Sequence, residues 1–126
     1  VQTINLKTAK ERYGKSFISK TIESNDLNSI LESSKFNVNK VDFISIDVEG
    51  HEFEILKNFD FKKYQPSIFV IEYNDPSLKK IEFYYQDLEN VKRSDLYKLL
   101  TENQYHFVNW HHSDLIFVSH EIYSNR

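Results

Sequence analysis

The sequence contains no cysteine and no methionine, and it has only two glycines and two prolines in 126 residues. Without cysteine the chain has no disulfide bonds, thiolate metal sites or cysteine nucleophiles, and we expect a cytoplasmic protein. No apolar run approaches the roughly 18 residues that a membrane-spanning helix needs, so we expect no membrane partner. Because a natural chain begins with methionine, we expect that Val1 marks a cut inside a longer sequence.

Charge of one sign is not concentrated anywhere along the chain. The 16 Lys and Arg residues are balanced by 19 Asp and Glu residues, which gives a net charge of -3. A face that binds nucleic acid needs clustered cations, so we expect no nucleic-acid partner. Hydrophobic residues make up 40% of the chain and include ten Phe and eight Tyr, which is enough to build one core.

Two β-rich runs, residues 41–47 and 67–73, flank a segment that is long enough for a crossover helix. Within that segment Phe53, Leu56 and Phe59 recur every three positions, as apolar residues do on one face of a helix. This order predicts two adjacent parallel strands. The second run is apolar at successive positions, which is typical of a strand covered by helices on both faces. We therefore predict a three-layer α/β sandwich with parallel central strands.

Weaker local signals predict the remaining elements. They are a short strand over residues 17–22, a helix capped by Ser24 or Asn25 and ending near Lys35, a helix capped by Ser94, and two strands over residues 105–110 and 115–119. The last two strands are joined by a polar turn and predict a closing antiparallel hairpin. Residues 74–93 are a connection long enough to act as a lid, in which Tyr84 and Tyr85 either contact substrate or fasten the lid.

Ionisable side chains are most concentrated in the run IDVEGHE, residues 46–52. The run lies where a strand ends and a helix begins, and open α/β sheets bind ligands at that edge. A structural interpretation explains part of it, because Gly50 permits a turn and Glu49 and Glu52 suit the positive end of a helix. It leaves Asp47 unexplained, since a strand-end acid beside another acid is costly unless water, a cation or a substrate hydroxyl meets it.

The segment VDFISIDVEGHEFEILKNF, followed by PSIFVIEY, resembles the IDxEGxE block and the next strand of FkbM-type methyltransferases. The likeness extends from about Thr21, through the SNDLNSIL helix, to the terminal DLIFV strand. It implies a class I, Rossmann-like fold, in which a seven-stranded sheet is parallel except for one strand near the end. It also implies transfer of a methyl group from S-adenosylmethionine to a hydroxyl oxygen of a small molecule or saccharide.

In such a fold, residues 1–126 would be the C-terminal portion of a single methyltransferase domain, with residues 41–47 as the fourth strand and residues 67–73 as the fifth. The family's Gly-rich turn and its ribose-binding acid would then lie before Val1. Gly14 stands alone and cannot replace that turn, so the sequence assigns no cofactor-binding residue. We expect calorimetry on the isolated chain to detect little binding of S-adenosylmethionine.

Methyl transfer to a hydroxyl requires a base that removes the hydroxyl proton. Asp47 ranks first as an orienting or proton-accepting catalytic group, and Glu49 and His51 rank behind it, although His51 has the ordinary pKa better suited to neutral pH. Glu72 ends the adjacent strand and would face the same crevice. It is expected either to bind substrate or simply to cap the edge of the strand.

Two other functions are compatible with these residues. Asp47, Glu49 and Glu72 could hold magnesium for phosphoester cleavage, although no lysine lies near them in the sequence to complete the usual nuclease set. The chain could also be a non-catalytic half-domain. His111 and His112 are adjacent and point in different directions, so we expect a solvated turn there and no metal site. The sequence gives no indication of the oligomeric state.

Overall fold

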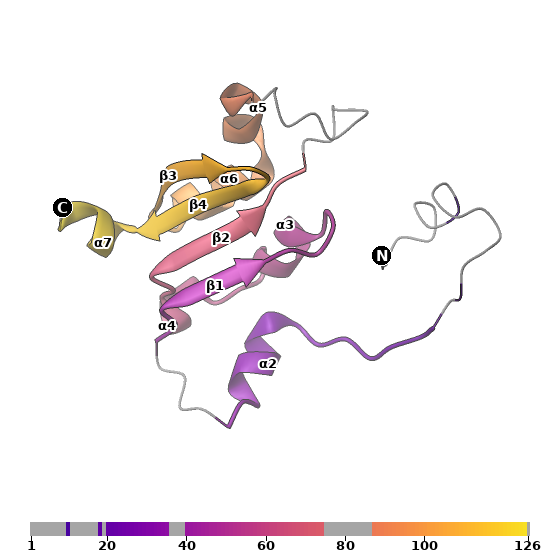
Figure 1. The fold of residues 1–126 in the computed structure, drawn as a ribbon. Coiled ribbons are helices and arrows are strands. Elements are labelled where there is room, and N and C mark those ends of the chain that lie inside the picture. The colour runs from indigo at the N-terminus through magenta and orange to yellow at the C-terminus, as the bar shows by residue number, and fades with distance from the viewer. Residues whose placement is uncertain (1–9, 11–17, 19, 36–39, 75–86, 126) are drawn as a thin grey trace.

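The computed structural model describes residues 10, 18, 20–35, 40–74 and 87–125 (Figure 1). Its centre is a four-stranded sheet of order β1-β2-β4-β3. The strands are β1 (Phe43–Ile46), β2 (Ile68–Glu72), β3 (Tyr105–His111) and β4 (Asp114–Ser119). The helices are α2 (Leu27–Glu32), α3 (Glu52–Leu56), α4 (Phe61–Tyr64), α5 (Leu88–Arg93), α6 (Asp95–Glu102) and α7 (His120–Ser124).

Strands β1 and β2 are parallel and adjacent, with Phe43 opposite Ile68 and Ile46 opposite Ile71. Helices α3 and α4 form the crossover between them, which confirms the prediction from the two apolar runs. Strand β4 is antiparallel both to β2 and to β3, so the predicted C-terminal hairpin is also confirmed. The sheet is therefore mixed, and β4 alone among its four strands runs against the others.

One face of the sheet carries the hydrophobic core. Alternate residues of a strand point to the same face, and those of β2 and β4 on this side are Phe69, Ile71, Leu115 and Phe117, all with no exposed surface. Helices α3, α4 and α6 lie on this side, behind the sheet in Figure 1. The aromatic rings of Phe59 and Phe61 from the crossover and of Tyr105 from β3 surround the ring of Phe69 and complete the core.

The opposite face of the sheet is open over β1 and β2. Phe43 of β1 is 55% exposed on this side, and its neighbours Ile68 and Val70 of β2 are only half-buried. No helix of the described ranges crosses this part of the face in Figure 1. The described part of the chain thus forms two layers, whereas the sequence predicted three. The reason is that the α3–α4 crossover and α6 both return to the same side of the sheet, and on the second side α7 is the one described helix that packs on the sheet, where Tyr123 stacks on His106 at the start of β3.

Several element boundaries also differ from the sequence prediction. Helix α2 begins after Asp26, whose carboxylate accepts a hydrogen bond from the Ser29 N–H at 3.1 Å, and the helix ends before Lys35. Helix α5 occupies the last part of the predicted loop at residues 74–93. No strand forms at residues 18 and 20–22, the described part of the expected short strand.

Other predictions at the ends of elements hold or lie outside the described residues. Ser94 caps α6 as predicted, because its hydroxyl accepts from the Tyr97 N–H at 3.2 Å. Tyr84 and Tyr85 lie outside the described residues.

None of the helices in the described ranges is both long and apolar enough to cross a membrane.

Candidate functional site

The candidate site lies where β1 and β2 end. Ile46 pairs with Ile71 in parallel register, so the residues that follow them, Asp47 and Glu72, lie at the same edge of the sheet. Their position in the sequence predicted this arrangement. We call Asp47 and Glu72 the carboxyl pair.

Burial of Glu72 and its contact with Asp47 change the protonation of the pair. The pKa of Glu72 is raised from 4.5 to about 7, first by burial and then by its contact with Asp47. The negative charges of Glu49 and Glu52 raise this pKa further. Glu72 Oε2 is buried and has no hydrogen-bond partner among the described residues. Near neutral pH the carboxyl pair therefore retains a proton that an ordinary pair of acids would have lost.

The turn that carries Asp47 has an uncommon backbone. We call residues 47–50 the signature loop. Glu49 and Gly50 have φ angles of 55° and 94°, in the left-handed region that glycine tolerates best. The position of a Cβ atom on Gly50 would meet nothing within 4 Å, so this glycine is required for the backbone conformation and not for close packing.

Glu52 closes the signature loop from the first position of α3. Its side chain is buried, with 6% of its surface exposed, and Oε1 accepts hydrogen bonds from the N–H groups of Val48 at 3.2 Å and Gly50 at 3.0 Å. The sequence linked Glu52 only to the helix dipole, so this role was missed. A signal existed, because an acid on the first turn of a helix often reaches back to N–H groups that precede it.

Glu49 and His51, the other two predicted catalytic residues, lie on the same turn as Asp47. Only Glu49 has a described interaction with the carboxyl pair. Glu49 is exposed and close enough for its charge to raise the pKa of Glu72. His51 is half-buried at the N-cap of α3 and makes no side-chain capping bond. Thus the structure gathers Asp47, Glu49, Glu52 and Glu72 around one strand edge, and it gives His51 no described interaction with the carboxyl pair.

The described residues include no group of three His, Cys, Asp or Glu side chains that could hold a metal ion. The phosphoesterase interpretation, which requires Asp47, Glu49 and Glu72 to share magnesium, therefore has no geometric support. His111 and His112 are both exposed, as expected for a solvated turn, and their rings meet edge to face at 4.3 Å.

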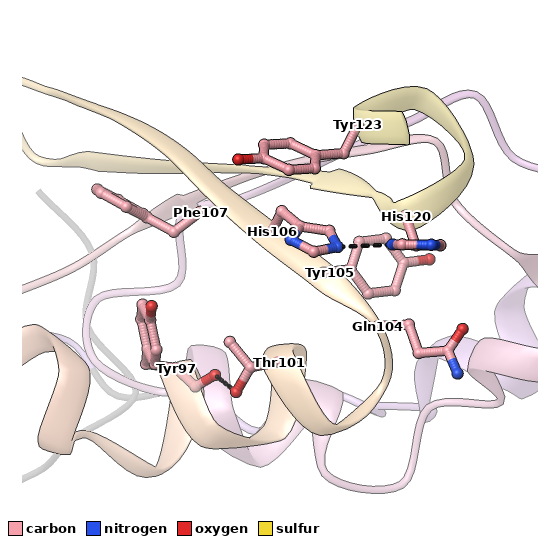
Figure 2. Close-up of a pocket in the computed structure, with 8 residues that line it drawn as sticks. All are labelled: Tyr97, Thr101, Gln104, Tyr105, His106, Phe107, His120 and Tyr123. Carbon is pink, nitrogen blue, oxygen red and sulfur yellow. Dashed lines mark hydrogen bonds between the residues drawn. The ribbon is translucent and has the colours of Figure 1, made fainter. Parts of the chain in front are cut away.

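A separate cavity of about 480 Å³ is lined by residues of α6, of the start of β3 and of α7 (Figure 2). His106, His120 and Tyr123 lie on one side of the strand, and Tyr97 and Thr101 lie on the other. His106 Nε2 and His120 Nδ1 are 2.9 Å apart. This cavity is at the start of β3, at the end of the sheet where β1 and β2 also begin. None of the predicted site residues lines it.

The raised pKa of Glu72 predicts how stability depends on pH. Between about pH 4.5 and pH 7 the unfolded chain releases this proton and the folded chain keeps it, so folding becomes less favourable as pH rises. Glu72→Gln removes the titration and resembles the protonated acid. We expect the variant to match the parent near pH 4 and to melt at a higher temperature at pH 8.

Thermal melts across this pH range test the prediction, with Glu102→Gln, an exposed acid on α6, as the matched control. The control should follow the parent at every pH. A Glu72→Gln variant that loses stability at pH 8 would contradict the raised pKa, because it would mean that the ionised carboxylate is favoured in the fold.

Methyltransferases of the type that the sequence resembles use S-adenosylmethionine, and the described residues show no cradle for it. Gly50 is the only glycine among them. No other group lies within 4 Å of the position that a Cβ atom on Gly50 would take, so this glycine does not make the close backbone approach of a cofactor-binding turn. We therefore assign no described side chain to cofactor binding.

Comparison with known proteins gives one match. Residues 2–107 match the model of the family described as Methyltransferase FkbM domain. Neither the search of curated proteins nor the search of solved structures found a match. The matched residues cover most of the chain and include both strands that carry the carboxyl pair, as well as the signature loop. The chain therefore belongs to the FkbM methyltransferase family.

Proposed function

We propose that this chain is part of an O-methyltransferase that uses S-adenosylmethionine and acts on a hydroxyl group of a small molecule or saccharide. Family membership supports methyl transfer. The sheet supports a class I fold, because its order β1-β2-β4-β3, with β4 alone reversed, corresponds to the last four strands of that fold. The cytoplasm remains the predicted location.

The observation that carries the proposal is the carboxyl pair at the edge where open α/β sheets bind ligands. A hydroxyl oxygen that accepts a methyl group must give up its proton. Asp47 is the exposed member of the pair, and Glu72 has a buried oxygen with no described partner, so an incoming hydroxyl reaches Asp47 first. A pair that gains or loses one proton near pH 7 is matched to this task.

The other predicted residues take supporting roles in this proposal. Glu49 keeps negative charge beside the pair, His51 remains a secondary candidate for proton transfer, and Glu72 also binds the acceptor. Tyr84 and Tyr85, which lie outside the described residues, remain predicted substrate contacts. S-adenosylmethionine would supply the methyl group as an electrophile, and the chain's own carboxylates would orient the acceptor and take its proton.

The direct test follows the methyl group. The full-length protein is incubated with S-adenosylmethionine labelled on its methyl carbon and with pooled hydroxylated small molecules and saccharides. We expect label in products that resist mild alkali, because methyl ethers are stable to alkali and methyl esters of carboxylic acids are not. Label that appears only in alkali-labile esters or on amine nitrogen would contradict the proposed hydroxyl acceptor.

A further inference from the structure

We propose that Glu52 is a positioning residue, which holds the signature loop in its left-handed conformation and thereby keeps Asp47 against Glu72. The effect on loop and carboxyl pair stands on the geometry alone. Its consequence for methyl transfer rests on the function proposed above.

The side chain of Glu52 is an acid buried inside the fold. Glu52 is the only charged side chain that is buried among the described residues, with 6% of its surface exposed. A buried carboxylate is costly unless hydrogen-bond donors satisfy it. Two backbone N–H groups, those of Val48 and Gly50, point at the same oxygen, Oε1. The loop thus supplies the donors that Glu52 needs, and Glu52 supplies the acceptor that these loop N–H groups need.

The backbone of the signature loop is strained. Glu49 has a φ angle of 55°, which costs free energy for a residue with a side chain. Gly50 follows at 94°, so two successive residues depart from the usual backbone regions. Backbone N–H groups that converge in this way form a concave site for an anion. The carboxylate of Glu52 fills this site from within the chain, and this stabilises a conformation that would otherwise open.

The helix dipole alone does not account for these contacts. Glu54 is also in the first turn of α3, and it stays exposed and forms an ion pair with Lys57. Glu52, by contrast, turns away from solvent and bonds to N–H groups that lie before the helix. Its charge also contributes to the raised pKa of Glu72. Glu52 therefore acts on the pair through both the shape of the loop and its own charge.

Three variants separate shape from charge. Glu52→Gln keeps an oxygen that can accept both hydrogen bonds and removes the charge. Glu52→Ala removes both. Glu54→Gln removes an exposed charge from the same helical turn and is the matched control. Nuclear magnetic resonance on the chain itself measures hydrogen exchange at the amides of Val48 and Gly50, together with the titration of the Glu72 carboxyl carbon. Neither measurement needs a cofactor or a methyl acceptor.

In Glu52→Gln we expect the two amides to keep their protection and the titration midpoint of Glu72 to fall. In Glu52→Ala we expect the amides to exchange at least about tenfold faster, since each loses its acceptor, and the midpoint to fall further toward 4.5. Glu54→Gln should resemble the parent. The proposal is overturned if Glu52→Ala folds with unchanged amide exchange. If Glu52→Ala does not fold, amides of Val48 and Gly50 that exchange in the parent as fast as those of an exposed loop overturn it instead.

Kinetics on the full-length protein then test the link to methyl transfer. We expect Glu52→Ala to lower kcat more than it raises KM, and Glu52→Gln to restore most of kcat while moving the pH profile to lower pH. A positioning effect in the resonance data without any effect on kcat would leave the loop assignment intact and count against the proposed role of the carboxyl pair.

Discussion

Asp47→Asn is expected to lower methyl transfer by the full-length protein about a hundredfold or more, with almost no change in its melting temperature. Asn preserves the size of the side chain and much of its hydrogen bonding, and Asp47 is exposed, so little packing is lost. A merely structural acid should tolerate the change at a cost of about 1 kcal/mol. Loss of a proton acceptor or orienting charge costs roughly 3 kcal/mol of barrier and should reduce turnover more than cofactor binding.

Steady-state kinetics beside a thermal melt would measure both quantities. Asp42→Asn is a suitable control, because Asp42 is an exposed acid that precedes the same strand and lies at its opposite end. If Asp47→Asn retains near-normal turnover, or loses activity only in proportion to the unfolded fraction, the IDVEGHE run is a strand-to-helix turn and Asp47 is not catalytic.

Phe69→Ala should destabilise the folded chain by about 3–5 kcal/mol, which is a large part of the total stability of a small domain. Phe69 is completely buried in β2. Its ring centroid lies 4.9 Å from that of Tyr105, 5.9 Å from that of Phe61 and 6.3 Å from that of Phe59. Truncation removes contacts with all three rings and leaves a cavity that the surrounding sheet and helices cannot fill completely.

Urea unfolding followed by circular dichroism gives the free-energy change, with Phe43→Ala as the matched control on the open face of the same sheet. Phe43 is 55% exposed, so its loss should cost about 1 kcal/mol or less. If the two variants lost similar stability, the open face would have to be covered in solution, and the two-layer description would be wrong.

The sequence determined the features that depend on local pattern. Two apolar runs separated by a helix-length segment predict parallel pairing, since parallel neighbours need a long crossover and a short turn cannot supply one. A polar turn between two β-rich runs likewise predicts the hairpin. Once β1 and β2 are parallel, Asp47 and Glu72 must share an edge, so the place of the candidate site also followed from the sequence. The family was predicted from the segment VDFISIDVEGHEFEILKNF with the following PSIFVIEY, and the match to the family model confirms it.

Only the tertiary structure decided the features that depend on which groups approach one another. Continuous apolar character in β2 does not say whether a helix covers its second face, and in the described residues none does. Ser24, Asn25 and Asp26 can all cap a helix, and only the observed start of α2 shows that Asp26 is the cap. The raised pKa of Glu72 and the role of Glu52 arise from burial and from distances across the turn. Residue spacing along the chain does not contain those distances, because they are set by how the strands, the loop and the helix pack together.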